Sequence, residues 1–197
     1  MNTKKILIIL GVLILIVGGY FYAYLKASAS MYSTHTVDKS PFYITKAPII
    51  IKHLNIPKGT TIRYKQRYFW QKMEQDKLLK EADITELSFE KGNYINWGGV
   101  PITSIYKFFN TDMTGYTVNA DFSALAADQE TPFSKQWQSC SNSLSITVKD
   151  ANDWSCNKNN LADIESCSVS YQRYFSEDAN QQMFLDQLYI ELMKIAD

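Results

Sequence analysis

YTVNADF, residues 116–122, is the clearest strand in the sequence and decides the class of fold. Its side chains alternate between apolar and polar, the period of two that a half-buried strand requires. One face holds Tyr116, Val118, Ala120 and Phe122, and the other holds Thr117, Asn119 and Asp121. A strand of this kind needs neighbours, so we expect an antiparallel sheet that buries one face.

Other segments have the β-branched and aromatic composition of strands and are bounded by turn residues. These strands are predicted at residues 42–46, 48–53, 62–70, 84–89, 94–97, 144–148 and 169–175. The Ile49-Ile50-Ile51 run indicates either a strand buried on both faces or an edge strand entering the core. The polar stretch 149–160 is expected to form a long exposed loop.

Three helices are expected in the same region. Residues 71–82 are good helix formers and predict a short surface helix. Pro101 suits the first turn of a second helix, with an apolar face made by Ile102, Ile105, Tyr106 and Phe109. Ser176 is a suitable cap for a final amphipathic helix, whose apolar stripe consists of Phe184, Leu185, Leu188, Leu192 and Ile195. The expected fold class is α+β.

The N-terminal residues predict where the protein is located. Residues 6–25 contain no charged side chain and are long enough for a helix of about 30 Å, which would cross a bilayer. The positive charges before this run orient residues 1–5 towards the cytoplasm. Residues 26–40 are expected to be a tether, and residues 41–197 an exported domain in the periplasm, anchored to the inner membrane by a single pass.

A cleaved signal peptide is the alternative for the same N-terminal segment. Ala27-Ser28-Ala29 satisfies the small-residue pattern of a cleavage site. The aromatic residues between Val17 and this site lengthen the apolar run beyond the usual signal peptide, which favours retention as a transmembrane helix. Both alternatives export the same domain.

The charge balance argues against nucleic acid as a partner. The chain has 20 basic and 20 acidic residues, a formal net charge of zero, and therefore no basic field to hold a phosphate backbone. Aromatic residues make up 14% of the chain. Tyrosine and tryptophan are common in cores and on strands, and they are also common in protein interfaces.

Three cysteines lie in the expected exported domain, where a disulfide can persist. If the strands near residues 144–148 and 169–174 pair, Cys156 and Cys167 share the connecting loop, and their pairing is the shortest closure. Cys140 with Cys167 is the rival pairing, because sequence alone does not fix connectivity. The spacing of these cysteines is not that of a zinc site.

No motif in the sequence identifies a catalytic site. The nucleophile-elbow, zinc-protease, P-loop and dinucleotide-binding patterns are all missing. Ser104 and Lys107 fit S-x-x-K, but the partner motifs of penicillin-recognising enzymes do not accompany them. We therefore expect a protein that is not an enzyme and that has no cofactor and no bound metal.

Turns and loops present side chains outward, so they are the first places to look for a partner-binding surface. The candidate residues in the segment 94–101 are Tyr94 and Trp97. The candidates in the loop 149–160 are Asp150, Asp153 and Trp154.

Five segments carry a resemblance to a known class of proteins: Trp97-Gly98-Gly99-Val100-Pro101, Phe108-Phe109-Asn110, Met113-Thr114-Gly115-Tyr116-Thr117-Val118, Ala120-Asp121-Phe122 and Tyr171-Gln172-Arg173-Tyr174-Phe175. With these segments the chain resembles small proteins encoded beside type VI secretion effectors in Gram-negative bacteria. The resemblance implies a periplasmic immunity protein that binds and blocks a secreted toxin, a phospholipase or a cell-wall hydrolase. The alternative function is a non-catalytic structural or assembly subunit of an envelope complex.

Overall fold

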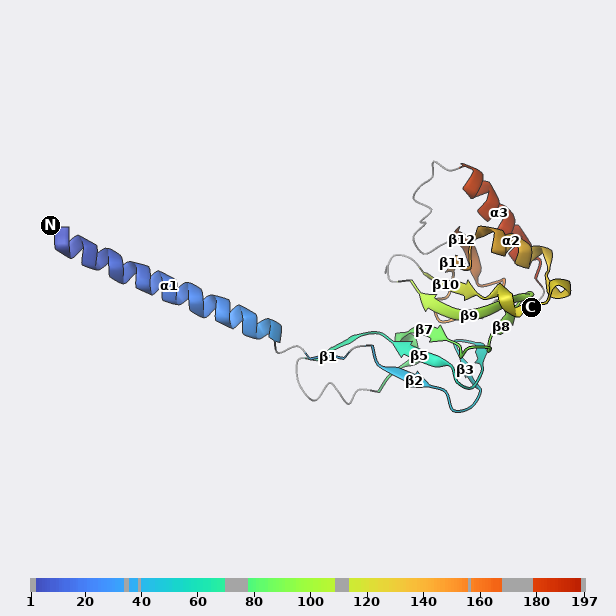
Figure 1. Ribbon diagram of the computed structural model, residues 1–197, viewed down its shortest axis with the longest axis horizontal. Coiled ribbons are helices and arrows are strands. Elements are labelled where there is room, and N and C mark those ends of the chain that lie inside the picture. The colour runs from blue at the N-terminus through green and yellow to red at the C-terminus, as the bar shows by residue number, and fades with distance from the viewer. Residues whose placement is uncertain are drawn as a thin grey trace. The chain divides into compact units, whose positions relative to one another are not determined.

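A computed structural model describes residues 3–33, 36–38, 40–69, 78–108, 114–155, 157–167 and 179–195. The chain divides into two compact units. The first contains the long helix α1 (Thr3–Ser33) and two short antiparallel strands, β1 (Thr36–Asp38) and β6 (Arg67–Phe69). The second contains every other described element (Figure 1).

Helix α1 leaves its large apolar side chains from Val12 to Leu25 uncovered. These side chains are half or more exposed. The structure contradicts the prediction of a transmembrane helix over residues 6–25. Within the described part of the chain, no helix combines the length and the apolarity needed to cross a membrane.

The second unit is built on one antiparallel sheet, which confirms the α+β class and the mainly antiparallel arrangement. The strand order is β12-β11-β10-β9-β7-β5-β2, and β8 pairs with β9 beside this path. The strands are β2 (Phe42–Ile44), β5 (Thr61–Tyr64), β7 (Ile84–Ser88), β8 (Ile95–Trp97), β9 (Val100–Lys107), β10 (Gly115–Ala120), β11 (Ser143–Val148) and β12 (Leu161–Ser166). A separate hairpin joins β3 (Ile49–Ile51) to β4 (Leu54–Ile56).

A single apolar row crosses five neighbouring strands in register. It consists of Ile62, Leu87, Ile105, Val118 and Leu144, each 3% exposed or less. The opposite face carries polar side chains, with Arg63 paired to Glu86 at 3.3 Å and Thr117 bonded to Ser145 at 3.2 Å. The alternation of apolar and polar side chains that the YTVNADF segment predicts therefore holds across these strands, although β10 itself ends at Ala120. The expectation that only one face is buried is wrong at β10 and β11, because Thr117 and Ser145 on the polar face are 4% and 5% exposed.

The predicted helix starting at Pro101 is wrong, because this segment is strand β9. The error has a physical cause in a β-bulge. Val118 pairs with Ile105 and Ala120 pairs with Ile102, so four residues of β9 lie opposite three of β10. Ile102 and Ile105 thus come to the same face at a spacing that otherwise indicates a helix.

Three short helical segments and two α-helices complete the described part of the second unit. They are η2 (Glu81–Asp83), η3 (Phe122–Ala124), η4 (Ala127–Gln129), α2 (Pro132–Cys140) and α3 (Ala179–Met193). Helix α3 packs on β12 and α2. Its Leu185, Leu188 and Leu192 are buried, as the apolar stripe predicts.

Helix α2 and strands β4 and β12 do not correspond to any predicted element. Thr131 caps α2 with its side chain and Pro132 follows at the first helical position, an N-terminal pattern that sequence can reveal. Most of the predicted helix 71–82, the predicted strand 169–175 and the cap Ser176 lie outside the described residues.

Ile49 and Ile50 are 39% and 71% exposed, so the expectation of a strand buried on both faces is wrong. Only Ile51 of this run enters the core, as in the second alternative that the sequence left open.

A candidate partner-binding platform

The turn between β3 and β4 has an unusual backbone. Lys52 and His53 form a two-residue connection, with φ angles of +47° and +65°. Such a turn normally contains Asn or Gly, and each larger residue in this conformation costs on the order of 1 kcal/mol or more. The surroundings hold the turn in place: the backbone N–H of Lys52 donates to the Glu81 carboxylate, and the N–H of Trp154 donates to the Lys52 carbonyl at 2.9 Å.

The Lys52 side chain joins this hairpin to the β11–β12 loop. It is 2% exposed, its Nζ lies 4.8 Å from the centroid of a Trp154 ring, and it donates to the Ala151 carbonyl at 3.5 Å. Burial lowers the pKa of Lys52, because the charged amine loses water, and Lys107 adds repulsion. Glu81 and Asp150 attract the ammonium and act in the opposite direction.

Asn160 organises the loop from inside. Its side-chain carbonyl accepts from the backbone N–H of Asp150 at 2.7 Å, and its amide nitrogen donates to the carbonyls of Asp150 and Asp153 at 3.2 and 2.9 Å. Asn160 is 6% exposed and Trp154 is 1% exposed. The stretch 149–160 is thus not the fully exposed loop that its polar composition predicts.

Local side-chain bonds fix the outer part of the loop. The carboxylate of Asp150 accepts from the N–H of Asn152 at 2.9 Å, and the side chain of Asn157 accepts from the N–H of Asn159 at 2.9 Å. Bonds of this type replace the backbone pairing that a loop lacks. We call Lys52, His53, residues 150–155 and residues 157–160 the hairpin–loop platform.

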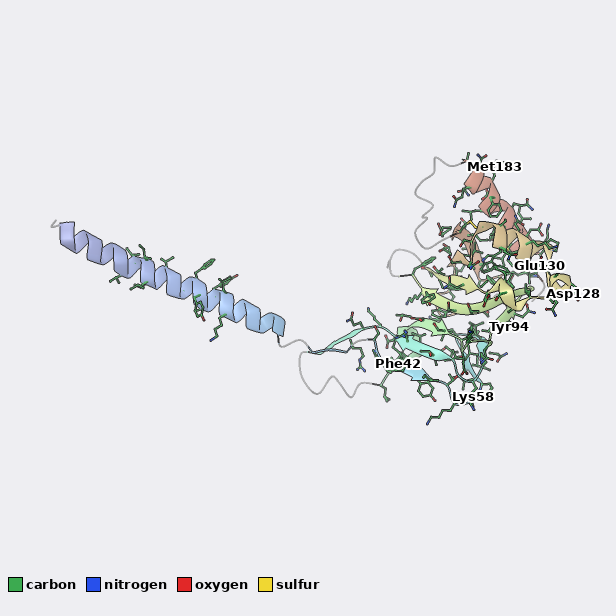
Figure 2. All side chains as sticks on the ribbon, in the orientation of Figure 1. Phe42, Lys58, Tyr94, Asp128, Glu130 and Met183 are labelled. Atoms are coloured by element: carbon green, nitrogen blue, oxygen red, sulfur yellow. A yellow bond between two sulfur atoms is a disulfide. The ribbon has the colours of Figure 1, made fainter. Side chains whose placement is uncertain are left out.

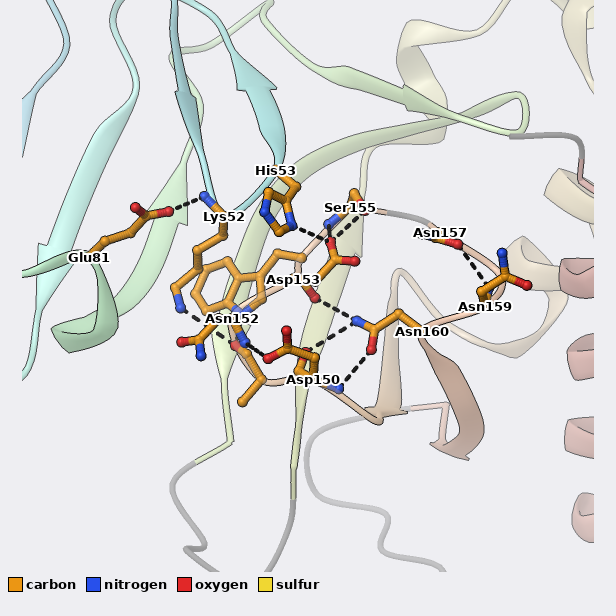
Figure 3. A network of polar contacts seen from close by, with 12 residues as sticks. Lys52, His53, Glu81, Asp150, Asn152, Asp153, Ser155, Asn157, Asn159 and Asn160 are labelled. Atoms are coloured by element: carbon orange, nitrogen blue, oxygen red, sulfur yellow. Dashed lines mark hydrogen bonds and ion pairs between the residues drawn. The ribbon is translucent and has the colours of Figure 1, made fainter.

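The platform brings a serine, a carboxylate and a histidine together without forming a catalytic triad. His53 Nδ1 lies 3.5 Å from Oδ1 of Asp153, and the Ser155 hydroxyl donates to the same oxygen (Figure 3). The carboxylate sits between the hydroxyl and the imidazole, whereas a triad needs the imidazole to take the hydroxyl proton. Among the described residues, no three His, Cys, Asp or Glu side chains are grouped to hold a metal ion.

The S-x-x-K match has no helical turn to support it. Ser104 and Lys107 both lie on the regularly paired part of strand β9, outside the bulge, so these two residues three apart point to opposite faces. The Ser104 hydroxyl accepts from the amide of Asn119 at 3.0 Å and is part of the polar face of the sheet.

The structure separates the predicted partner-binding residues into two groups. Asp150, Asp153 and Trp154 belong to the platform, whereas Tyr94 and Trp97 belong to the segment leading through β8. Asp150 and Tyr94 are exposed, and Tyr94 is 43% exposed, so both stay candidates. Asp153 is partly buried, with its carboxylate bonded to Ser155.

Both tryptophans are wrong as partner contacts, because their side chains are buried. Trp97 is 3% exposed and packs edge-on against Phe133 and Trp137, with ring centroids 6.5 and 5.7 Å apart. Trp154 packs against Tyr116, with 5.9 Å between their ring centroids. Sequence reasoning missed Lys52, His53 and Asn160, since their roles depend on contacts between segments far apart in the chain.

The disulfide links Cys140, the last residue of α2, to Cys167, the residue after β12, with 5.5 Å between their Cα atoms. The first-choice pairing of Cys156 with Cys167 is therefore wrong, and the rival pairing is the one formed. Shortest closure is a poor guide here because helix α2 returns to the end of β12. Cys156 lies outside the described residues.

Comparison with family models, with curated proteins and with solved structures finds no match to this chain.

Proposed function

We propose that this chain is an exported, non-catalytic protein that binds and inhibits a protein partner through the hairpin–loop platform. Following the resemblance to immunity proteins, the partner is a toxic effector delivered by type VI secretion, a phospholipase or a cell-wall hydrolase. The observation that carries the proposal is the fixed geometry of a polar, surface-reaching loop.

Binding is efficient when the contacting groups are already ordered, because association then costs little conformational entropy. The platform meets this condition because buried side chains of the chain itself order it. Buried Lys52, Trp154 and Asn160 hold its inner side, while the His53 side chain is 71% exposed and Asn152 is exposed. An inhibitor needs a rigid surface of this kind and no chemistry of its own.

Two features support export. The Cys140–Cys167 disulfide is of a type that persists outside the reducing cytoplasm. The apolar helix α1 exposes side chains that favour a lipid surrounding over water, as an export signal does. A reporter fused after residue 197 should then be active only when it folds outside the cytoplasm. A mature chain that begins at Ser30 would identify cleavage after Ala29.

The test of the inhibitor function uses the effector encoded beside this gene. Cells that lack the chain should be killed by siblings delivering that effector, and the full-length chain should bind the effector with a dissociation constant below about 1 µM. Normal survival of the deletion strain together with no binding would reject the proposal.

A matched pair of variants tests whether the platform is the surface that contacts the partner. Asn152→Arg adds bulk and charge on the platform at a side chain that is exposed, and we expect at least a tenfold loss of affinity and loss of protection. Asn142→Arg makes the same change at an exposed position between α2 and β11, and should protect like the unmodified chain. Equal affinity of the two variants would place the contact elsewhere.

The open edge of the sheet favours a second candidate, an assembly subunit of an envelope complex. Strand β2 carries three exposed apolar or aromatic side chains at that edge, and sheet edges commonly join proteins. An assembly role predicts a defect in envelope structure when the gene is deleted, even in cells that meet no effector.

A further inference from the structure

Strand β2 forms an unprotected edge of the large sheet. It pairs with β5 on one side, and no other strand among the described residues pairs with its second side. Figure 1 shows it at the lower margin of the sheet. Proteins usually protect such edges with charged side chains, proline or a covering segment, because an open edge is a template for another strand.

The backbone N–H and C=O groups of successive residues in β2 point alternately towards β5 and towards the unpaired edge. Thr45 donates its N–H to Thr60 at 3.0 Å, and the Pro41 carbonyl accepts from the N–H of Tyr64 at 2.9 Å. Residues 41, 43 and 45 thus point their backbone groups towards β5. In an antiparallel pair the residues between them point away, so the N–H and C=O groups of Phe42 and Ile44 face the open edge. The missing N–H of Pro41 does not affect that edge.

The side chains at this edge are uncharged and exposed. Phe42, Tyr43 and Ile44 are 61%, 45% and 51% exposed, and Figure 2 labels Phe42 on this strand. Tyr43 pairs with Ile62 and lies on the apolar face of the sheet, whereas Phe42 pairs with Arg63 and lies with Ile44 on the polar face. The Arg63 guanidinium, 5.9 Å from the Phe42 ring centroid, is itself paired to Glu86.

We propose that a second copy of this chain pairs antiparallel with β2 about a two-fold axis through Tyr43, which continues the sheet from one copy into the other. Phe42 then lies opposite Ile44 of the second copy, and the two residues exchange their outward backbone hydrogen bonds. The two-fold axis repeats this pair, so four hydrogen bonds form.

The side chains are complementary to themselves in this register. The two Phe–Ile pairs share one face and cover each other, and the two copies of Tyr43 meet on the other face. Lys46 lies opposite Ser40 of the second copy, so the described residues of the edge place no like charges opposite one another. A formal net charge of zero removes the general repulsion between copies.

A contact made by three edge residues is small, so the dimer should be weak, with a dissociation constant on the order of 1 µM or higher. This pairing does not depend on the proposed function. The oligomeric state of the chain tests the pairing, independently of what the platform binds.

Cysteine cross-linking tests the register in the full-length chain. With Cys156 replaced by serine, Tyr43→Cys places two thiols across the axis on residues whose Cα atoms are about 4.5 Å apart, within disulfide range. Mild oxidation should convert most of this variant to a covalent dimer on a non-reducing gel. Lys46→Cys is the control on the same strand, and should cross-link at least tenfold less because it faces Ser40.

A charge exchange tests the same pairing without a covalent bond. Phe42→Lys with Ile44→Lys puts like charges opposite each other twice and should abolish the dimer, measured by light scattering of the detergent-solubilised full-length chain. Phe42→Lys with Ile44→Glu puts opposite charges in the same places and should restore it. Only pairing of β2 with itself predicts this rescue.

Three outcomes would overturn the proposal. One is equal cross-linking at positions 43 and 46, and another is an unmodified chain that stays monomeric at about 1 mM, far above the expected dissociation constant. The third is a Tyr43→Cys product with the mass of a different protein, which would make the occupant of the edge a strand of another partner.

Discussion

Asn160 is the residue on which the shape of the β11–β12 loop depends. Asn160→Ala would leave one N–H and two carbonyl groups of the loop backbone without their side-chain partner. We expect a loss of about 1–3 kcal/mol in the free energy of unfolding, measured by chemical denaturation.

Asn159→Ala is the matched control for this change. Asn159 is exposed, and the bond that holds it is donated by its backbone N–H, which alanine retains. Its cost should stay within about 0.5 kcal/mol. Equal costs for the two variants would mean that the loop does not depend on the Asn160 amide.

Lys52 predicts a specific dependence of stability on pH. Its pKa is lowered in the folded chain, so the unfolded chain binds more protons between the folded pKa and the unfolded value of about 10.4. Stability contributed by Lys52 should therefore rise with pH in that window. In Lys52→Met, which keeps an apolar stem over Trp154, this rise should disappear.

The comparison is best made between pH 7 and 10. Burial raises the pKa of Tyr64, so its contribution to stability is present at lower pH and falls once the pH exceeds about 10. Tyr64 is common to both chains, so it cancels when the unfolding free energies of the unmodified chain and of Lys52→Met are subtracted. A difference that stays constant over this range would contradict the role assigned to the buried ammonium.

At the scale of the elements, the β8–β9 hairpin positions the start of α2. Gly98 and Gly99 form a two-residue turn with φ angles of +56° and +87°, and a Cβ on Gly99 would lie 2.7 Å from Cγ2 of Thr131. Thr131 is the N-cap of α2 and is held there by reciprocal bonds with Ser134. The hairpin therefore has little freedom to accept a larger residue.

Gly99→Ala and Gly92→Ala separate backbone strain from crowding. Gly92 has nearly the same φ angle, +90°, but its Cβ would meet open space. We expect Gly92→Ala to cost about 1–2 kcal/mol for the left-handed backbone alone. Gly99→Ala should cost about 1–3 kcal/mol more because of the contact with Thr131. Equal unfolding free energies in thermal denaturation would show that Thr131 moves aside freely.

At the scale of the whole molecule, the disulfide connects two elements whose sequence positions differ by 27. Replacing Cys140 and Cys167 by serine releases that closed loop, and the expected loss is about 3.5 kcal/mol in the free energy of unfolding. Cys156→Ser is the control and should have a smaller effect. Reduction of the disulfide should make the unmodified chain as unstable as the double variant.

Much of the fold can be predicted from sequence where local pattern and tertiary contact agree. Alternation in residues 116–120 and the apolar stripe of α3 predict a strand and a helix because a periodic apolar face must be buried. Prediction fails for β9, where a bulge changes the spacing of Ile102 and Ile105. It fails again for Trp97 and Trp154, since composition does not tell a buried indole from an exposed one.

The sequence by itself determined the α+β class, the period of the strands and the apolar N-terminal helix, and it left two disulfide pairings open. Tertiary structure decided which pairing forms, which loop residues become a platform, and that β2 is left at an edge. The physical reason is that these properties arise between segments distant in the chain. The buried amine of Lys52 meets Trp154 only after the hairpin and the loop have come together.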